Sequence, residues 1–195
     1  LLHVTMRDSF FYAGARKRRI LITCPHVLGS DDCEEKNDPG AIESATELWK
    51  TLGNCGFPCT LLGGSEDRRT CDLNREPCNF PFAQKLHELL LDHEVVFDIH
   101  SYRPRPGVFN GATGLVCLTP STGIKHLEVL EGLEQSFPDL VVLKGGNNYI
   151  INTAATFGRA ALLLEVPYTL CGKCCFKGDW RQLAKVFETD VCDGC

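Results

Sequence analysis

Short apolar runs alternate along this chain with segments of helical periodicity. The most informative run covers 95–101, where an apolar start leads into the polar cluster Asp98-Ile99-His100-Ser101. Runs of this length are typical of strands that are buried in a parallel sheet. Further strands are predicted at 19–24, 59–62, 114–118, 140–143 and 161–166, with an edge strand at 9–12.

Apolar residues at helical spacing separate these strands. Asp38 and Pro39 are typical of the N-cap and first position of a helix, and Gly53 of a helix end, so a helix is predicted between them. Residues 145–149 are expected to form a loop. The alternation indicates an α/β fold, a three-layer α/β/α arrangement around a mainly parallel or mixed central sheet. Further helices are predicted at about 82–92, 124–133 and 179–188.

The length of 195 residues predicts one main domain with a small appendage. We place the α/β domain at 1–168 and a cysteine-rich C-terminal extension, packed on it, at 169–195. The net charge of −5 argues against a nucleic-acid partner. No apolar run reaches the roughly 20 residues needed to cross a bilayer, so no membrane partner is predicted.

The 12 cysteines have two interpretations. One is a secreted protein held together by disulfides. The other rests on Cys24, Cys71 and Cys117, which lie in or beside apolar runs, where a free cysteine behaves as a small hydrophobic residue. The second interpretation is favoured, and it predicts a mostly reduced, cytoplasmic protein.

The C-terminal cysteines form a spacing motif of their own. Cys171 and Cys174 are followed by Cys192 and Cys195, which gives two C-x-x-C pairs. This layout is typical of a structural zinc site with four cysteine ligands. Disulfides and a redox pair remain open as alternatives.

Two histidines lie at the predicted strand ends, His26 after the strand at 19–24 and His100 in the strand at 95–101. Ligands of open α/β sheets bind beyond the carboxyl ends of the strands, and imidazole is a usual zinc donor. A catalytic zinc needs a third ligand, and Asp38 is the candidate because it opens the following helix. Asp31, Asp32 and Glu35 are the alternatives.

Two carboxylates complete this candidate site. Asp98 shares a strand face with His100, two residues on, and is expected to orient its ring. Glu165 ends a strongly apolar strand, where burying a carboxylate is costly unless it has a functional role or an interaction partner. It is the candidate general base, with a pKa raised by burial. The alternative for Glu165 is a structural ion pair.

A polar loop at 64–75 adds candidate substrate contacts. The guanidinium group of Arg75 suits a substrate carboxylate, and Asn74 can donate a hydrogen bond beside it. Either Arg68 or Arg69 is placed to offset an oxyanion.

Together these residues resemble the N-formylglutamate amidohydrolase family and, beyond it, the superfamily of zinc carboxypeptidases and aspartoacylases. The most specific matches are the Arg-x-x-x-Asp-Leu-Asn-Arg segment at 68–75 and the Asp-x-His-Ser segment at 98–101. The resemblance implies a zinc-carboxypeptidase-like fold. The other segments that carry it are Cys24-Pro25-His26, Asp38-Pro39-Gly40-Ala41 and Glu165-Val166.

By this resemblance His26 and His100 hold zinc and Glu165 activates water. Asn74 and Arg75 would hold a substrate carboxylate, with Arg68 at the oxyanion, and Tyr149 is a further candidate for substrate binding. The His-x-x-Glu motif of carboxypeptidases is absent, since Gly29 is the third residue after His26, and the third ligand therefore stays open.

The resulting prediction is a zinc-dependent hydrolase that cleaves an amide bond next to a carboxylate. Its substrate would be a small molecule or a peptide that bears that carboxylate, such as an N-formyl or N-acyl amino acid. Two alternatives are kept: a small zinc carboxypeptidase, and a non-catalytic member that binds a peptide or partner.

Overall fold

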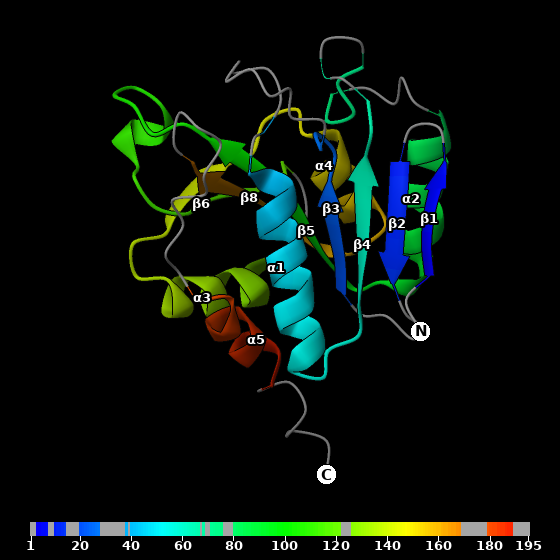
Figure 1. Ribbon diagram of the computed structural model, residues 1–195. Helices are drawn as coiled ribbons and strands as arrows, with labels where there is room; N and C mark the ends of the chain where they lie inside the picture. Colours follow the sequence, from blue (N-terminus) through cyan, green and yellow to red (C-terminus); the bar gives the residue numbers. More distant parts are fainter. Residues whose placement is uncertain are drawn as a thin grey trace.

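The computed structural model describes residues 3–7, 10–14, 20–27, 38, 40–66, 68, 71–75, 80–121, 126–168 and 179–188. One sheet of eight strands forms its centre, in the order β1-β2-β4-β3-β5-β8-β6-β7 (Figure 1). The strands are β1 (His3–Arg7), β2 (Phe10–Gly14), β3 (Ile20–Cys24), β4 (Cys59–Gly64), β5 (Val95–Tyr102), β6 (Val116–Thr119), β7 (Val141–Lys144) and β8 (Ala160–Pro167).

The sheet is mixed around a parallel centre. Strands β4, β3, β5 and β8 are parallel neighbours, while β2 pairs with β4 and β6 with β8 in the antiparallel sense. Because parallel strands end at the same edge, β3, β5 and β8 deliver their carboxyl ends to one place. The predicted α/β class with a mainly parallel or mixed sheet is confirmed.

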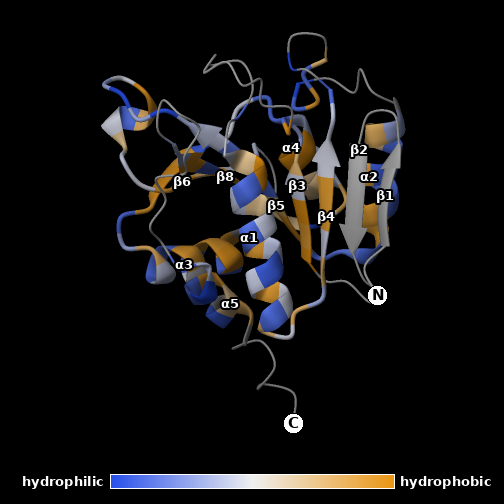
Figure 2. Ribbon diagram, in the orientation of Figure 1, coloured by the Kyte–Doolittle hydropathy of each residue, from blue (hydrophilic) through white to orange (hydrophobic). Residues whose placement is uncertain are grey.

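Helices cover both faces of the sheet. One buried core joins the sheet to α1 (Ala41–Asn54), α3 (His126–Ser136) and α5 (Trp180–Glu188). The other joins it to α2 (Phe80–Asp92) and α4 (Tyr149–Thr156). A short 3-10 turn, η1 (Phe109–Gly111), follows β5. In Figure 2 the central strands β3 and β4 are largely hydrophobic, as expected of strands covered on both faces.

The alternation of side chains decides where the polar residues of the central strands point. On β5, Phe97 and Ile99 enter the core under α1, whereas Val96 enters the core under α2 and α4. Asp98 and His100 share the face of Val96, because successive side chains point to opposite faces. The register pairs Thr23 with Asp98, and His100 with Glu165. The site residues of three strands therefore lie on one face at one edge.

Three expectations for the elements were wrong. The predicted edge strand at 9–12 is β2, which lies between β1 and β4. The predicted loop at 145–149 runs into α4, a helix that the sequence analysis missed. The predicted N-cap Asp38 is not the cap of α1, because Gly40 occupies that position with φ 85° and without a side-chain hydrogen bond. The Asp38 carboxylate is therefore available to the site.

The cysteines among the described residues are of two kinds. Cys24, Cys55, Cys59 and Cys117 carry free thiols, whereas Cys71 is disulfide-bonded. The expectation that Cys71 is a free hydrophobic residue is wrong, and its disulfide is typical of an oxidising compartment. This observation counts against a cytoplasmic location, which stays a prediction. Within the described ranges, no helix is long and apolar enough to cross a membrane.

The predicted extension at 169–195 is described only at 179–188. Helix α5 in that range adds Trp180, Leu183, Ala184 and Phe187 to the core shared with α1 and α3. The division into two parts stays a prediction. The four cysteines of the predicted structural zinc site, Cys171, Cys174, Cys192 and Cys195, lie outside the described residues.

Candidate metal centre

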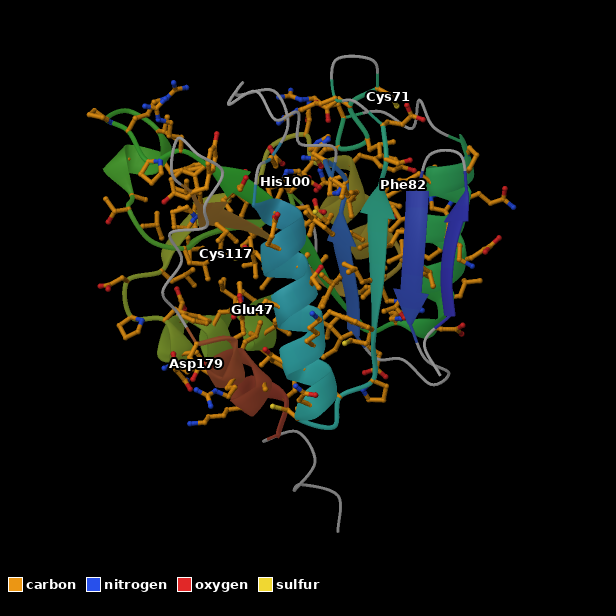
Figure 3. All side chains as sticks on the ribbon, in the orientation of Figure 1. Glu47, Cys71, Phe82, His100, Cys117 and Asp179 are labelled. Atoms are coloured by element: carbon orange, nitrogen blue, oxygen red, sulfur yellow. The ribbon has the colours of Figure 1, made fainter. Side chains whose placement is uncertain are left out.

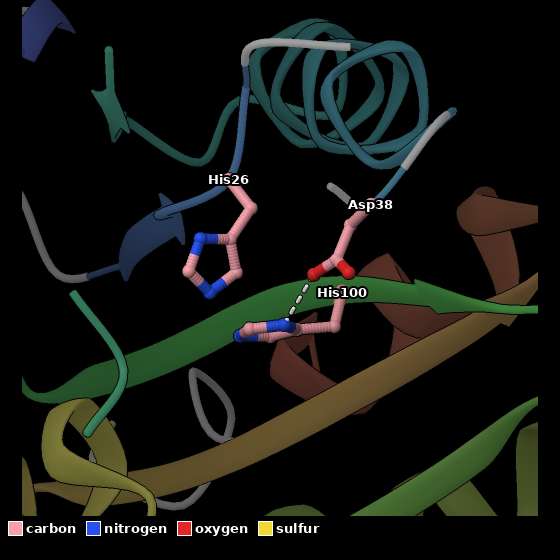
Figure 4. A group of neighbouring side chains, drawn as sticks. All are labelled: His26, Asp38 and His100. Atoms are coloured by element: carbon pink, nitrogen blue, oxygen red, sulfur yellow. Dashed lines mark hydrogen bonds and ion pairs between the residues drawn. The ribbon is translucent and has the colours of Figure 1, made fainter. Parts of the chain in front are cut away.

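The structure brings three predicted ligands together at the carboxyl edge of the sheet (Figure 4), and Figure 3 labels His100 among the side chains of the whole structure. One ligand atom from each of His26, Asp38 and His100 lies within 4.8 Å of the other two. All three side chains are buried, with exposed fractions of 1%, 7% and 2%. The two imidazole rings meet edge to face, with centroids 5.3 Å apart.

His26 gives the clearest indication of a missing partner. Both of its ring nitrogens are buried, and neither has a hydrogen-bond partner in the described structure. Its Nε2 lies 3.2 Å from Oδ1 of Asp72, but outside hydrogen-bond geometry. Burying a polar group without a partner costs about 1–3 kcal/mol. A cation bound between His26, Asp38 and His100 would give one of these two nitrogens a partner, so the residues present fit a metal.

The ring of His100 is held from both sides. Its Nδ1 lies 2.6 Å from Oδ2 of Asp38, and its Nε2 lies 3.0 Å from Oδ2 of Asp98. Metal-binding histidines commonly bind the ion through one nitrogen and a carboxylate through the other. In this arrangement Nδ1 faces the other ligands, while Asp98 fixes the orientation of the ring, as the sequence predicted for the pair.

Asp98 is itself fully buried and held by two further donors. The hydroxyl of Thr23 donates to its Oδ1 at 2.6 Å, and Nδ2 of Asn148 donates to its Oδ2 at 3.2 Å. Asn148 also caps α4, where its Oδ1 accepts the amide N–H of Ile151 at 2.9 Å. One side chain therefore connects the start of α4 with the support of His100.

Asn148 was not among the residues predicted from the sequence. An Asn ahead of the apolar pair at 150–151 is a helix-start signal, but the glycines at 145–146 favoured a loop. The hydrogen bond to Asp98 spans 50 residues of sequence, and no local pattern reports such a contact.

Arg68 connects the metal ligands with the polar loop. Its Nη1 lies 3.3 Å from Oδ1 of Asp38, and its Nε lies 3.3 Å from Oδ2 of Asp72. Asp72 lies between Arg68 and His26, and Arg75 approaches it at 3.7 Å. Burial alone would raise the pKa of Asp72, but His26 and Arg68 outweigh it and hold the pKa well below its usual range.

The predicted loop residues differ in what they contact. The side chain of Arg75 is 69% exposed, so it is available to a ligand. Asn74 has a buried Oδ1 without a hydrogen-bond partner in the described structure, and its carbonyl accepts the amide N–H of Tyr149 at 2.7 Å. The hydroxyl of Tyr149 lies 3.2 Å from Nε2 of His87 on α2. The structure therefore does not bring the Tyr149 hydroxyl to the metal ligands.

Glu165 lies next to His100 in the register of β5 and β8, and its side chain is partly buried. Burial raises the pKa of Glu165 to about 8. The negative charges of Asp38 and Asp98 raise this pKa further, whereas His100 lowers it. A carboxyl group with a pKa near neutrality can accept and return a proton at working pH.

The ligands themselves have strongly shifted pKa values. Burial opposes the charge on His100, but Asp98 and Asp38 outweigh it and raise its pKa well above the ordinary value. Burial also tends to raise the pKa of Asp38, yet His100, His26 and Arg68 hold it below its usual range. A cation bound at this place would displace the proton of His100, because a metal binds the neutral imidazole.

Close backbone packing positions His26. Gly64, the last residue of β4, lies against the carbonyl of Pro25 and the side chain of Leu73, and a Cβ at this position would overlap both. The segment before His26 and the polar loop can approach the end of β4 only because residue 64 is a glycine. The other predicted candidates, Asp31, Asp32, Glu35 and Arg69, lie outside the described residues.

No protein-family model matches the chain, and no curated protein matches it. Solved structures do. The gene product Atu2144 from Agrobacterium tumefaciens superimposes with a TM-score of 0.60 and 16% identity, over 94% of this chain and 92% of that chain.

Two enzymes of known type share the fold. Succinylglutamate desuccinylase from Chromobacterium violaceum has a TM-score of 0.51 at 12% identity, over 91% of this chain and 62% of the enzyme. Murine aminoacylase 3 has a TM-score of 0.51 at 13% identity, over 89% of this chain and 64% of the enzyme. The chain has the zinc-carboxypeptidase-like fold. Identities this low show the fold alone, and the narrower N-formylglutamate amidohydrolase family stays a prediction.

Proposed function

We propose that this protein is a metal-dependent hydrolase, with zinc as the metal, that cleaves an amide bond next to a carboxylate. The observation that carries the proposal is the buried group of His26, Asp38 and His100, in which His26 has no hydrogen-bond partner among the described residues. Two histidines and one carboxylate form a ligand set that catalytic zinc sites use, with one position left for water. The fold supports the proposal, because the desuccinylase and the aminoacylase share it.

The ligands would be His26, Asp38 and His100, and the ion they hold would polarise the water and the amide carbonyl. Glu165 takes a proton from the attacking water and returns it to the leaving nitrogen, consistent with a pKa of about 8. Asp98 keeps the ring of His100 in place through its Nε2.

Three side chains of the polar loop would position the substrate. Arg68 lies 3.3 Å from Asp38, and its guanidinium group would stabilise the negative charge that develops on the carbonyl oxygen. Arg75 is exposed and would form charge-assisted hydrogen bonds with the substrate carboxylate. The side-chain amide N–H of Asn74 would donate a hydrogen bond to the same carboxylate.

A matched substrate panel tests this proposal. N-formyl and N-acetyl amino acids are compared with the corresponding α-amides, which lack the carboxylate, and with short peptides. We expect kcat/KM to be roughly tenfold to hundredfold higher for the acids, the effect of one charge-assisted hydrogen bond. Arg75→Ala should abolish this preference, and a chelator should abolish all turnover.

Each other outcome of the panel has a clear meaning. Turnover of peptides alone would show that the protein is a carboxypeptidase and does not act on acyl amino acids. Equal rates for acids and amides would show that Arg75 does not recognise the substrate carboxylate. No turnover of any substrate with zinc present would contradict the hydrolase and favour the non-catalytic alternative.

A further inference from the structure

Two neighbouring residues at the start of α4 contact different parts of the candidate site. The side chain of Asn148 donates to Asp98, which holds the ring of His100. The backbone N–H of Tyr149 donates to the carbonyl of Asn74 in the polar loop at 2.7 Å. The first contact belongs to the proposed metal site and the second to the proposed substrate contacts, so one dipeptide connects the two.

The orientation of the Asn148 amide follows from its partners. The N–H of Ile151 can only donate, so Oδ1 of Asn148 faces it, at 2.9 Å. The nitrogen Nδ2 then faces the carboxylate of Asp98 and donates to its Oδ2 at 3.2 Å. The side chain of Asn148 is buried. A single amide therefore supplies both the acceptor that the helix needs and the donor that Asp98 needs.

The carboxylate of Asp98 depends on few donors. Its Oδ2 accepts from Nε2 of His100 at 3.0 Å and from Asn148, while its Oδ1 accepts from the hydroxyl of Thr23 at 2.6 Å. Without Asn148, only Thr23 and the ring itself would fix the plane of this buried carboxylate. Since partners of this kind orient the ligand that they contact, Asn148 helps to fix the ring through Asp98.

The backbone before α4 is held against the end of β6. The N–H of Gly145 donates to the carbonyl of Thr119 at 2.7 Å, and a Cβ at residue 145 would overlap that carbonyl. The carbonyl of Gly146 accepts the N–H of Asn148 at 2.9 Å and Nδ2 of Asn152 at 3.1 Å. These bonds fix where α4 begins, so its two contacts with the site are made from a fixed position.

From these contacts we propose that Asn148 and Tyr149 are positioning residues that hold the metal site and the substrate contacts in register. Asn148 acts through Asp98 on the ring of His100, and the backbone N–H of Tyr149 acts on Asn74 through its carbonyl. This inference rests on the proposed function, because it concerns the same metal and the same substrate. It assigns a different measurable effect to each of the two residues.

The first arm of the test measures zinc affinity by competition with a coloured chelator, in a Cys171→Ser/Cys174→Ser background that excludes zinc at the C-terminal cysteines. Asn148→Ser keeps a good N-cap, but its hydroxyl is attached one bond nearer to the backbone than Nδ2 and does not reach Asp98. We expect zinc to bind about tenfold more weakly, at the lower end of the effect of residues that orient a ligand. Asn148→Thr, a cap of larger volume, should show the same loss.

Two controls separate this effect from a general loss of stability. The side chain of Asn152 lies on the same helix and bonds to Ser121 and Gly146, so Asn152→Ser should bind zinc as the parent does. In an Asp98→Ala background, Asn148→Ser should cause no further loss of affinity, because its effect passes through Asp98. Circular dichroism of each variant shows whether the fold is retained.

The second arm removes the N–H of Tyr149 without breaking α4. Proline is favoured at the first position of a helix, and Asn148 already has the extended backbone expected before a proline, with φ −83° and ψ 113°. Tyr149→Pro is compared with Tyr149→Ala, which loses the same ring but keeps the N–H. On the best substrate of the panel, we expect a KM roughly twofold to tenfold higher for the proline variant than for the alanine variant, with equal zinc affinity.

The outcomes distinguish this proposal from the proposed function. If the parent is an active zinc enzyme but Asn148→Ser binds zinc as tightly as Asn152→Ser, the role of Asn148 is overturned and the hydrolase stands. An equal KM in Tyr149→Pro and Tyr149→Ala would overturn the role of Tyr149 in the same way. Weaker zinc binding by Asn148→Ser without turnover of any substrate would support the role of Asn148 but contradict the hydrolase, and with it the role of Tyr149. A parent that binds no zinc would overturn both proposals.

Discussion

Glu165→Gln is expected to lower kcat by roughly 10²- to 10⁴-fold, the usual contribution of a general base. Gln has nearly the same shape but cannot accept the proton of the attacking water. Because Glu165 is not one of the three grouped ligand residues, the variant should bind the metal with unchanged stoichiometry. Steady-state kinetics on the best substrate, together with metal analysis of the same sample, would measure both effects.

A second variant separates the chemical role of Glu165 from a structural one. Glu128 lies in the first turn of α3, away from the metal ligands, so Glu128→Gln is a matched control that should retain full activity. If Glu165→Gln retained the activity of the parent protein, Glu165 would be no part of the mechanism. A Glu165→Gln variant that lost its metal as well would indicate a role in building the site.

Asp38→Asn is expected to weaken zinc binding by at least about a hundredfold. Replacing a residue that only supports a ligand typically costs about 10- to 100-fold in metal affinity, and a direct ligand should cost no less. Oδ2 of Asp38 lies 2.6 Å from Nδ1 of His100. A carboxylate oxygen of Asp38 also lies within 4.8 Å of a ligand atom of His26 and of His100. Competition with a coloured chelator at fixed pH would measure the affinity.

The same experiment decides between the candidates for the third ligand. Asp31→Asn, Asp32→Asn and Glu35→Gln are the matched controls, because each removes one of the competing carboxylates. All three should bind zinc as the parent does. Unchanged affinity in Asp38→Asn, together with a large loss in one of these controls, would transfer the ligand role to that residue.

The fold and the positions of two candidate ligands could be predicted because their signals are local. Strands β3, β5 and β8 are continuous apolar runs, and each ends in or near a polar residue, namely His26, His100 or Glu165. Parallel pairing then brings such strand ends to one edge of the sheet without further information. Asp38 was predicted as a ligand for its place before a helix, although Gly40 and not Asp38 caps that helix.

The rest of the site depends on contacts between distant segments. Asn148 and Thr23 lie 50 and 75 residues from Asp98, and neither pattern nor spacing connects them. Tyr149 was expected to bind substrate, but the start of α4 turns its hydroxyl towards His87. The disulfide of Cys71 was missed because an apolar neighbourhood is equally typical of free and of bonded cysteines.

Zinc content per chain tests the central claim most directly. The measurement is made in a Cys171→Ser/Cys174→Ser background, so that zinc bound by the C-terminal cysteines does not contribute. In that background we predict one zinc per chain, and its complete loss when His26→Ala and His100→Ala are added together. If the double histidine variant retained the same zinc content as its parent, the metal centre described here would be contradicted.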